Sequence, residues 1–262
     1  MGVAEALALD PVEGSVDVFV NRQPTNAVHV FGGLLIGQAL RAATLTVDGA
    51  GARLPCSCHA SFVVAGTGGE PIRYEVERTR DGASFSTRRV IARQAKGVVL
   101  ALTADFHEDE EGLEYSADLG DVGSPDGLEA GRYSNDMFES RDVPATGAPP
   151  HARRAWFRAV DPVDAVDDAL HLQALAMLTD FGPTRAAREP HARLADESSR
   201  QSVSLDHSVW FHRPARVTDW LLSELVPVST GRGRGLAMGT VRAADGVLVA
   251  SFAQEVLLRV RR

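Results

Sequence analysis

Three polar side chains, Asp180, Ser204 and Gln254, have the chemistry needed to activate a water molecule. A carboxylate can take a proton from water, while a hydroxyl and an amide can hold that water in place. The set emerges when the two halves of the chain are superposed. The superposed positions of the first half are, in the same order, Leu40, Cys56 and Asp105. Asp180 thus has an aliphatic counterpart, and Ser204 has a thiol counterpart. This difference between the halves predicts one working site per chain.

The superposition rests on an order of segments that occurs twice. An apolar segment at 31–43 predicts a helix, and a strand follows at 58–66; the second half repeats them at 171–180 and 206–214. The segment that begins at Gly246 matches the one that begins at Gly97, 149 residues earlier. A repeat of this length indicates a duplicated domain rather than a solenoid.

The segments after each predicted helix have the pattern of antiparallel strands. Residues 71–80 alternate apolar and charged, Asp81-Gly82 predicts a hairpin turn, and 85–94 resumes as a strand with Arg88 and Arg93 predicted to point outward. Two further strands precede and follow a turn at Asp245-Gly246. One helix wrapped by an antiparallel sheet, formed twice, predicts an α+β double hotdog fold.

Composition restricts the classes of function. The formal net charge of -8 argues against nucleic acid as a partner, because phosphate binding needs a basic surface. Cys56 and Cys58 are expected to be core thiols in a reducing compartment rather than a disulfide or a metal site. We find neither an N-terminal export signal nor an apolar run of about 20 residues, so the cytoplasm and no membrane span are expected.

The chain divides into three predicted parts. Residues 1–107 form an N-terminal hotdog unit, 108–150 an acidic linker, and 151–262 a C-terminal hotdog unit that carries the polar set. Between 108 and 150 there are twelve acidic residues against two arginines, with proline and glycine throughout, which is typical of a solvated linker.

Four segments in the same order carry a family resemblance: VFGGLLIGQAL from Val30, RDGASFSTRRV from Arg80, LDHSVWFHRP from Leu205 and DGVLVASFAQE from Asp245. They resemble the bacterial acyl-CoA thioesterase II family from about Asn21 to the end, with a poor match only in the acidic linker. The chain departs from the family at two places: Leu34 stands where the family has a glutamine, and Val64-Ala65-Gly66 stands where it has Arg-Pro-Gly.

The resemblance implies hydrolysis of acyl-CoA thioesters by water without a metal or redox cofactor. The family's Asp, Thr or Ser, and Gln fall on Asp180, Ser204 and Gln254, the set already found in the repeat. Burial beside Phe181 and the negative end of a helix should raise the pKa of Asp180 towards that of a useful base. The backbone amides of Gly32 and Gly33, at the start of the first helix, are the expected donors to the oxyanion; the alternative is close helix packing.

Other assignments remain open. A covalent aspartyl thioester route is possible, as is an acyl-CoA-binding or scaffold protein of low activity. A hydratase or dehydratase would need Asp206-His207, but adjacent strand residues point to opposite faces. The acyl length and the carrier, CoA or a carrier protein, are not specified, and a homo-oligomer of two to four chains is expected by resemblance.

Two further groups have a structural and a functional interpretation. His207 and His212 flank an aromatic pair and are expected to make buried hydrogen bonds rather than to transfer protons. Four arginines could meet the phosphates of CoA, although solvated strand ends are the favoured interpretation. These are Arg88, Arg89, Arg232 and Arg234.

Overall fold

A computed structural model describes residues 1–22, 27–47, 53–117, 123–144, 151–164, 167–192 and 200–260, with the side chains of 200, 201 and 260 left out of account. The helices are α1 (Val3–Ala6), α2 (Gly32–Thr44), α3 (Asp168–Leu178) and α4 (Pro183–Arg188), followed by a 3₁₀ turn at Glu189–His191. Among these residues no helix combines the length and apolar character needed to cross a membrane.

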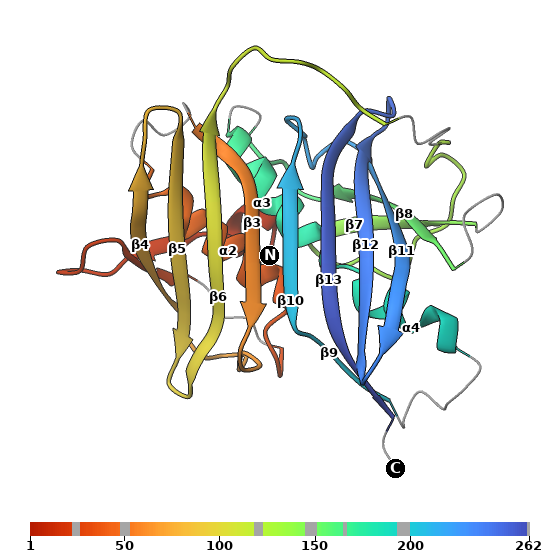
Figure 1. Ribbon diagram of the computed structural model, residues 1–262, viewed down its shortest axis with the longest axis horizontal. Helices are drawn as coiled ribbons and strands as arrows, with labels where there is room; N and C mark the ends of the chain where they lie inside the picture. The colour runs from red at the N-terminus through yellow and green to blue at the C-terminus, as the bar shows by residue number, and fades with distance from the viewer. Residues whose placement is uncertain are drawn as a thin grey trace.

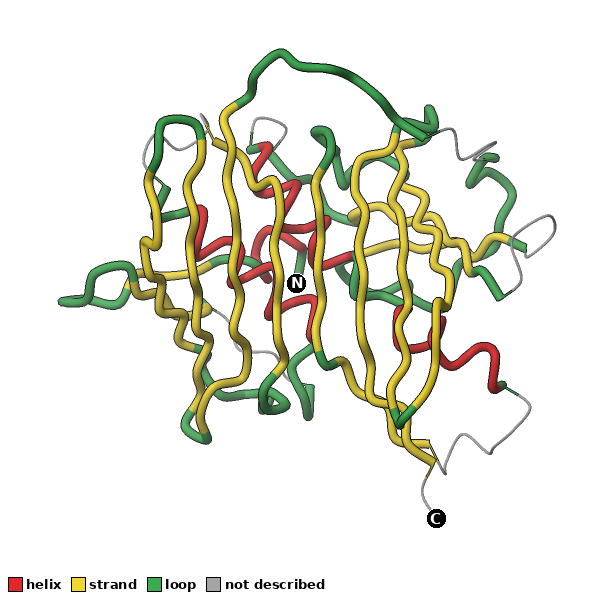
Figure 2. Tube along the Cα trace, viewed as in Figure 1, coloured by secondary structure: helices red, strands yellow, loops and turns green. Residues whose placement is uncertain are grey.

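The strands form one antiparallel sheet that runs through both halves (Figures 1 and 2). Its order is β1-β2-β4-β5-β6-β3-β10-β13-β12-β11-β8-β7, with β9 paired to β13. The strand bounds are β1 Leu9–Pro11, β2 Val18–Asn21, β3 Arg53–Phe62, β4 Arg73–Asp81, β5 Phe85–Gln94, β6 Gly97–Glu108, β7 Phe138–Val143, β8 Arg153–Ala159, β9 Arg200–Ser204, β10 Asp206–Phe211, β11 Leu221–Gly231, β12 Arg234–Ala243 and β13 Leu248–Val260. The β3–β10 pair joins the halves, so the predicted helix and antiparallel strands in each half are confirmed.

Helices α2 and α3 lie behind the sheet in Figure 1 and pack against each other in opposite directions. Gly33 at the start of α2 faces Met177 at the end of α3, and Gly37 faces Gln173. A Cβ atom on Gly33 would lie 2.3 Å from the Met177 carbonyl oxygen, closer than any side chain can approach. Glycine at this position therefore permits the close contact that places the start of one helix beside the end of the other.

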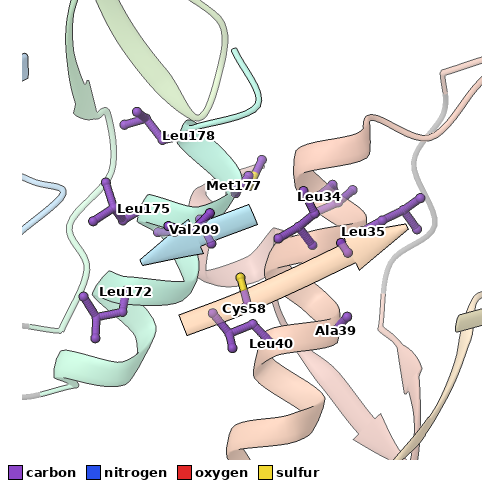
Figure 3. Close-up of a cluster of buried hydrophobic side chains, with 14 of the residues drawn as sticks. Leu34, Leu35, Ala39, Leu40, Cys58, Leu172, Leu175, Met177, Leu178 and Val209 are labelled. Atoms are coloured by element: carbon purple, nitrogen blue, oxygen red, sulfur yellow. The ribbon is translucent and has the colours of Figure 1, made fainter. Parts of the chain in front are cut away.

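The two helices and the central strands share one apolar core (Figure 3). Leu34 and Leu40 from α2 are buried in it, together with leucines of α3 and Val209 of β10. Cys58 is also fully buried there, and burial raises the pKa of its thiol to about 12. Both cysteines are free thiols; Cys58 lies in the core as expected, whereas Cys56 is only partly buried. At Leu34, where the family resemblance leads us to expect a glutamine, the chain thus contributes to the core rather than to a polar site.

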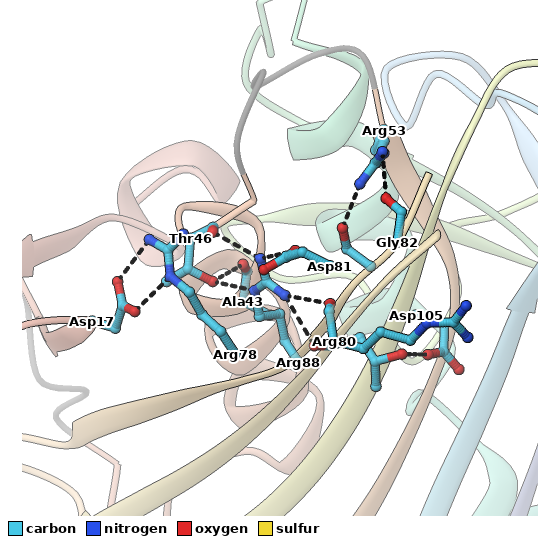
Figure 4. Close-up of polar contacts among 12 residues, drawn as sticks. Asp17, Ala43, Thr46, Arg53, Arg78, Arg80, Asp81, Gly82, Arg88 and Asp105 are labelled. Carbon is cyan, nitrogen blue, oxygen red and sulfur yellow. Dashed lines mark hydrogen bonds and ion pairs between the residues drawn. The ribbon is translucent and has the colours of Figure 1, made fainter. Parts of the chain in front are cut away.

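Arg88 is fully buried, which contradicts the prediction of an outward side chain. Its Nη2 donates to Asp81 Oδ1 at 2.7 Å and to the Thr46 carbonyl at 3.0 Å, and its Nη1 donates to the Arg80 carbonyl (Figure 4). These bonds connect the β4–β5 hairpin to the loop after α2. Arg88 is therefore a structural residue, neither a solvated strand end nor a phosphate contact, because its charge is satisfied inside the fold.

The predicted acidic linker contains an ordered strand. Within 108–150, residues Phe138–Val143 form β7, which pairs with β8 at the outer edge of the second half of the sheet. Its inward positions are Phe138 and Ser140, both fully buried. The hydroxyl of Ser140 accepts a hydrogen bond from the Tyr133 amide at 3.1 Å. The second unit thus begins its sheet earlier than residue 151, while the domain boundaries at 107 and 150 stay a prediction.

Candidate active site

Asp180 lies just beyond the end of α3, where the chain turns sharply. Gly182 has a φ of 105°, and Pro183 begins α4 directly after it. A side chain is strained at that φ, so glycine permits the reversal. The turn directs the Asp180 carboxyl towards the start of α2, where its Oδ2 lies 2.8 Å from the place that a Cβ atom on Gly32 would occupy.

The surroundings of Asp180 favour a proton acceptor that titrates near neutrality. Burial is the main cause that raises the pKa of this carboxyl, from an ordinary 3.8 to about 7. Hydrogen bonds from the Gly33 amide and the Gln254 side chain act in the opposite direction, because they stabilise the carboxylate. A group with such a pKa can be ionised before reaction and can hold a proton after it.

Gln254 and Ser204 are brought to the same place by adjacent strands. Gln254 is fully buried on the inner face of β13, and Ser204 ends β9, which pairs with β13. The Gln254 Nε2 donates to Ser204 Oγ at 2.7 Å. One amide group therefore contacts both Asp180 and Ser204, and the three residues of the predicted set form one cluster.

His207, on β10, lies behind Gln254. Its Nδ1 is 2.6 Å from Gln254 Oε1, and its Nε2 is 2.8 Å from Thr179 Oγ1. Burial is the main cause that lowers the pKa of His207 to about 4, so the ring is neutral at neutral pH. The expected buried hydrogen bonds are thus confirmed for His207, whereas His212 bonds Ser251 at the exposed surface.

The site joins the two halves of the chain, because Asp180 follows α3 and Gly33 belongs to α2. The sequence predicts that the Gly33 amide faces the substrate; in the structure this amide also lies beside the Asp180 carboxyl and acts to lower its pKa. Phe31, the N-cap of α2, provides no side-chain hydrogen bond to the helix. The first-turn amides are thus open to an acceptor from elsewhere, and the positive helix end attracts the carboxylate.

The structure corrects one pairing in the internal repeat. Asp105 does not share the inner face with Gln254: its Oδ1 accepts from Thr87 Oγ1 at 2.6 Å, while its neighbours Ala104 and Phe106 are fully buried. Successive strand residues point to opposite faces, so an alignment displaced by one residue exchanges inward for outward side chains. The inward neighbours of Asp105 are apolar, and the asymmetry between the halves is stronger than the sequence comparison indicates.

Aromatic side chains surround the residue after Asp180. Phe181 stacks on Phe31 with ring centroids 4.7 Å apart, and it contacts Phe157 and Tyr133 at 5.9 and 5.8 Å. Behind it lies a cavity of about 170 Å³ whose lining includes Tyr133, Phe157 and Leu225. The comparison of the two halves of the sequence does not identify these residues or Thr179. An isolated hydroxyl at the end of an otherwise apolar helix is the signal that could have identified Thr179.

The described residues contain no group of three or more His, Cys, Asp or Glu side chains placed to hold a metal ion.

Both ring nitrogens of His207 are engaged by Thr179 and Gln254, while Asp206 accepts from the Glu255 amide at 2.8 Å. The Asp206-His207 pair that a hydratase would need is therefore not formed. The cluster offers a carboxylate, a hydroxyl and an amide around one point.

The chain is similar to known proteins in both sequence and fold. Sequence models of the N-terminal and C-terminal domains of acyl-CoA thioesterases match residues 21–107 and 105–258. The chain belongs to the acyl-CoA thioesterase II family. It is 30% identical over 260 residues to acyl-CoA thioesterase 2 of Haemophilus influenzae, with 88% of each chain covered. It is 31% identical over 290 residues to acyl-coenzyme A thioesterase 8 of Rattus norvegicus, covering 98% of this chain and 88% of the relative.

The acyl-CoA thioesterase II family also accounts for the fold. The crystal structure of acyl-CoA thioesterase II TesB2 from Mycobacterium marinum superposes with a TM-score of 0.85 at 33% identity, covering 99% of this chain and 98% of that one. The predicted α+β double hotdog fold and the predicted family are therefore confirmed. By this membership the protein is a thioester hydrolase.

Proposed function

We propose that the protein hydrolyses acyl-CoA thioesters by attack of a water molecule that Asp180 activates. The observation that carries this proposal is the buried Asp180 carboxyl, with its pKa near 7, in one cluster with Ser204 and Gln254. A thioester carbonyl is already electrophilic, so a positioned water, a base and oxyanion donors suffice. The cytoplasmic location, the homo-oligomer and the choice of CoA over a carrier protein stay predictions.

The reaction has two steps. Asp180 takes a proton from water as the water oxygen bonds to the thioester carbon, and the carbonyl electrons move to oxygen. The oxyanion then collapses, the C–S bond breaks, and the thiolate leaves with the proton that Asp180 holds. Ser204 accepts from Gln254, so its own hydroxyl hydrogen is available to orient the water. The products are a free acid and a thiol, and Asp180 is again a carboxylate.

The oxyanion is stabilised by the start of α2. Because the Gly33 amide already donates to Asp180, the amides of Gly32 and Leu34 are the remaining donors of the first turn. The positive end of the helix supports them. In this arrangement one helix start both orients the base and stabilises the transition state. The cavity beside Phe181 is the candidate space for the start of the acyl chain.

Asp180→Asn tests the proposal. The carboxamide keeps the size of the side chain but cannot accept the proton, so kcat should fall by at least about 100-fold. Release of free thiol is followed with a colorimetric reagent across a series of acyl-CoA lengths. Asp105→Asn, on the outer face of the sheet, is the matched control and should keep its turnover. A folded Asp180→Asn protein with near-normal turnover would show that the proposed base is wrong.

The covalent route is distinguished by a single turnover in ¹⁸O-labelled water. If Asp180 acts as a base, the label enters the product acid in the first turnover. If Asp180 attacks the thioester, expels the thiolate and forms an anhydride that water opens at the Asp180 carbonyl, the first acid released carries an unlabelled oxygen from the carboxylate, and the label remains on Asp180. Mass spectrometry of the acid and of the peptide that contains Asp180 reads both outcomes.

A further inference from the structure

Both the nitrogen and the oxygen of the Gln254 side-chain amide have hydrogen-bond partners in the site. Its Nε2 donates to Ser204 Oγ at 2.7 Å and contributes a hydrogen bond to Asp180, while its Oε1 contacts His207 Nδ1 at 2.6 Å. An amide can rotate by 180° and exchange its oxygen for its nitrogen. Its function in the site therefore depends on what holds it in one orientation.

We propose that His207 is a positioning residue for hydrolysis: its Nδ1–H fixes the Gln254 amide with the NH₂ group towards Asp180 and Ser204, and Thr179 holds the required tautomer of the imidazole. This inference rests on the proposed function, since it assigns a role in that reaction. It goes beyond the three-residue set because neither His207 nor Thr179 touches the reacting atoms.

The tautomer follows from counting protons. Gln254 Oε1 can only accept, so the 2.6 Å contact requires a hydrogen on His207 Nδ1. A neutral imidazole carries one such hydrogen, and Nε2 must then accept. In this tautomer the Thr179 hydroxyl, 2.8 Å away, gives its single hydrogen to Nε2 in competition with the Ala176 carbonyl at the same distance. His207 is fully buried, and the cost of burying an imidazolium keeps the ring neutral.

The opposite tautomer of His207 would turn the Gln254 amide by 180°. With the hydrogen on Nε2, the Thr179 hydroxyl would donate to the Ala176 carbonyl, which is also 2.8 Å away. His207 Nδ1 would then need a donor, and Gln254 would have to turn its NH₂ group towards the ring. Its carbonyl oxygen would face the Asp180 carboxylate, which is repulsive, and Ser204 would lose its donor. The position of one proton on His207 therefore decides whether the amide supports the base.

The first test compares substitutions that differ in one donor. His207→Leu fills the space without a donor and should lower kcat by about 10- to 100-fold, less than the loss of a direct transition-state donor, with KM changed by less than about threefold. His207→Asn places an amide nitrogen near the position of Nδ1 and should recover at least about fivefold of that loss. His212→Leu is the matched control and should keep the parent kcat, because His212 bonds Ser251 at the surface.

A double-mutant cycle separates positioning from a general packing role. His207→Leu combined with Gln254→Ala should be no slower than Gln254→Ala alone, because His207 acts through the amide. Losses that multiply, or a His207→Leu protein with the parent kcat, would overturn the inference. Rates are measured well below the thermal midpoint of each variant, so that a change in stability does not enter kcat.

A readout that needs no substrate completes the test. Long-range ¹H–¹⁵N NMR spectra of histidine-labelled protein report which ring nitrogen carries the proton; His207 should be protonated at Nδ1, and Thr179→Val should weaken this preference while Thr179→Ser preserves it. Protonation at Nε2 would overturn the inference. If His207 shows the expected tautomer but Asp180→Asn keeps its turnover, the proposed function fails while the described hydrogen bonds stand.

Discussion

The Asp180→Asn protein should gain stability relative to the native protein as the pH rises, while its kcat is at least about 100-fold lower. Burial raises the pKa of Asp180 from an ordinary 3.8 to about 7, so the folded protein binds a proton here more tightly than the unfolded chain does. A group of this kind contributes stability below its unfolded pKa and loses it as the pH rises through the folded value. Between pH 5 and pH 8 the native protein should therefore lose roughly 3 kcal/mol relative to the carboxamide.

Urea denaturation of both proteins at pH 5, 6, 7 and 8 measures this difference. The test uses the change with pH rather than the value at one pH, because the carboxamide of the variant also places an NH₂ group near Gly33 or Gln254 at a constant cost. Other groups, His207 included, titrate in both proteins and cancel. A difference in unfolding free energy that stays constant within about 0.5 kcal/mol from pH 5 to pH 8 would show that Asp180 has an ordinary pKa.

Four further outcomes are expected. The active form of the base is the carboxylate, so kcat should rise with pH through about 7 and be about tenfold below its plateau at pH 6; a flat profile over this range would exclude Asp180 as the titrating base. Gly32→Ala places a Cβ atom 2.8 Å from Asp180 Oδ2 and should lower kcat by about 10-fold or more with little change in thermal midpoint. Gly33→Ala instead meets the backbone of α3 and should lower the stability by about 2 kcal/mol or more, as denaturation curves will report. Ser204→Ala should reduce kcat about 10- to 1000-fold, and its combination with Gln254→Ala should cost less than the product of the two losses, since both hold one water.

Helices α2 and α3 and the central strands were predictable because each has a regular apolar pattern. β7 was not, because its inner face includes Ser140, a buried hydroxyl that bonds local backbone groups and has no apolar signal. Arg88 was misplaced for a related reason. Its charge suggests an outward position, but five hydrogen bonds satisfy the guanidinium inside the fold. Ser140 and Arg88 are both buried because the folded chain supplies hydrogen-bond partners for them. The residues next to them in the sequence do not reveal those partners.

The sequence predicts which residues form the candidate site but not how these residues contact one another. The repeat and the family resemblance identify Asp180, Ser204 and Gln254, and the structure brings them together. The internal comparison gave Gln254 the wrong counterpart, since a shift of one residue within a strand exchanges the two faces. It could not show that Asp180, from the other half of the chain, lies beside the Gly33 amide, because no local pattern marks an acceptor so distant in the sequence. Such bonds become visible only when the helices are placed side by side.

The two helix starts explain why the chain has one such site rather than two. At the start of α3, Asp167 caps its own helix by accepting from the Leu170 amide at 2.9 Å, and Arg41 of α2 lies 3.4 Å from the same carboxylate. That junction is complete within the structure, with its charge paired. At the start of α2, Phe31 offers no cap, and the acceptor is Asp180 from the other half. A carboxylate held this way has no cationic side chain among the causes that set its pKa, so it stays basic enough to take a proton. The antiparallel pair of α2 and α3 has two ends, and the source of the acceptor distinguishes them. At one end a residue next to the same helix caps it, and at the other, where we propose catalysis, the carboxylate comes from the other half of the chain.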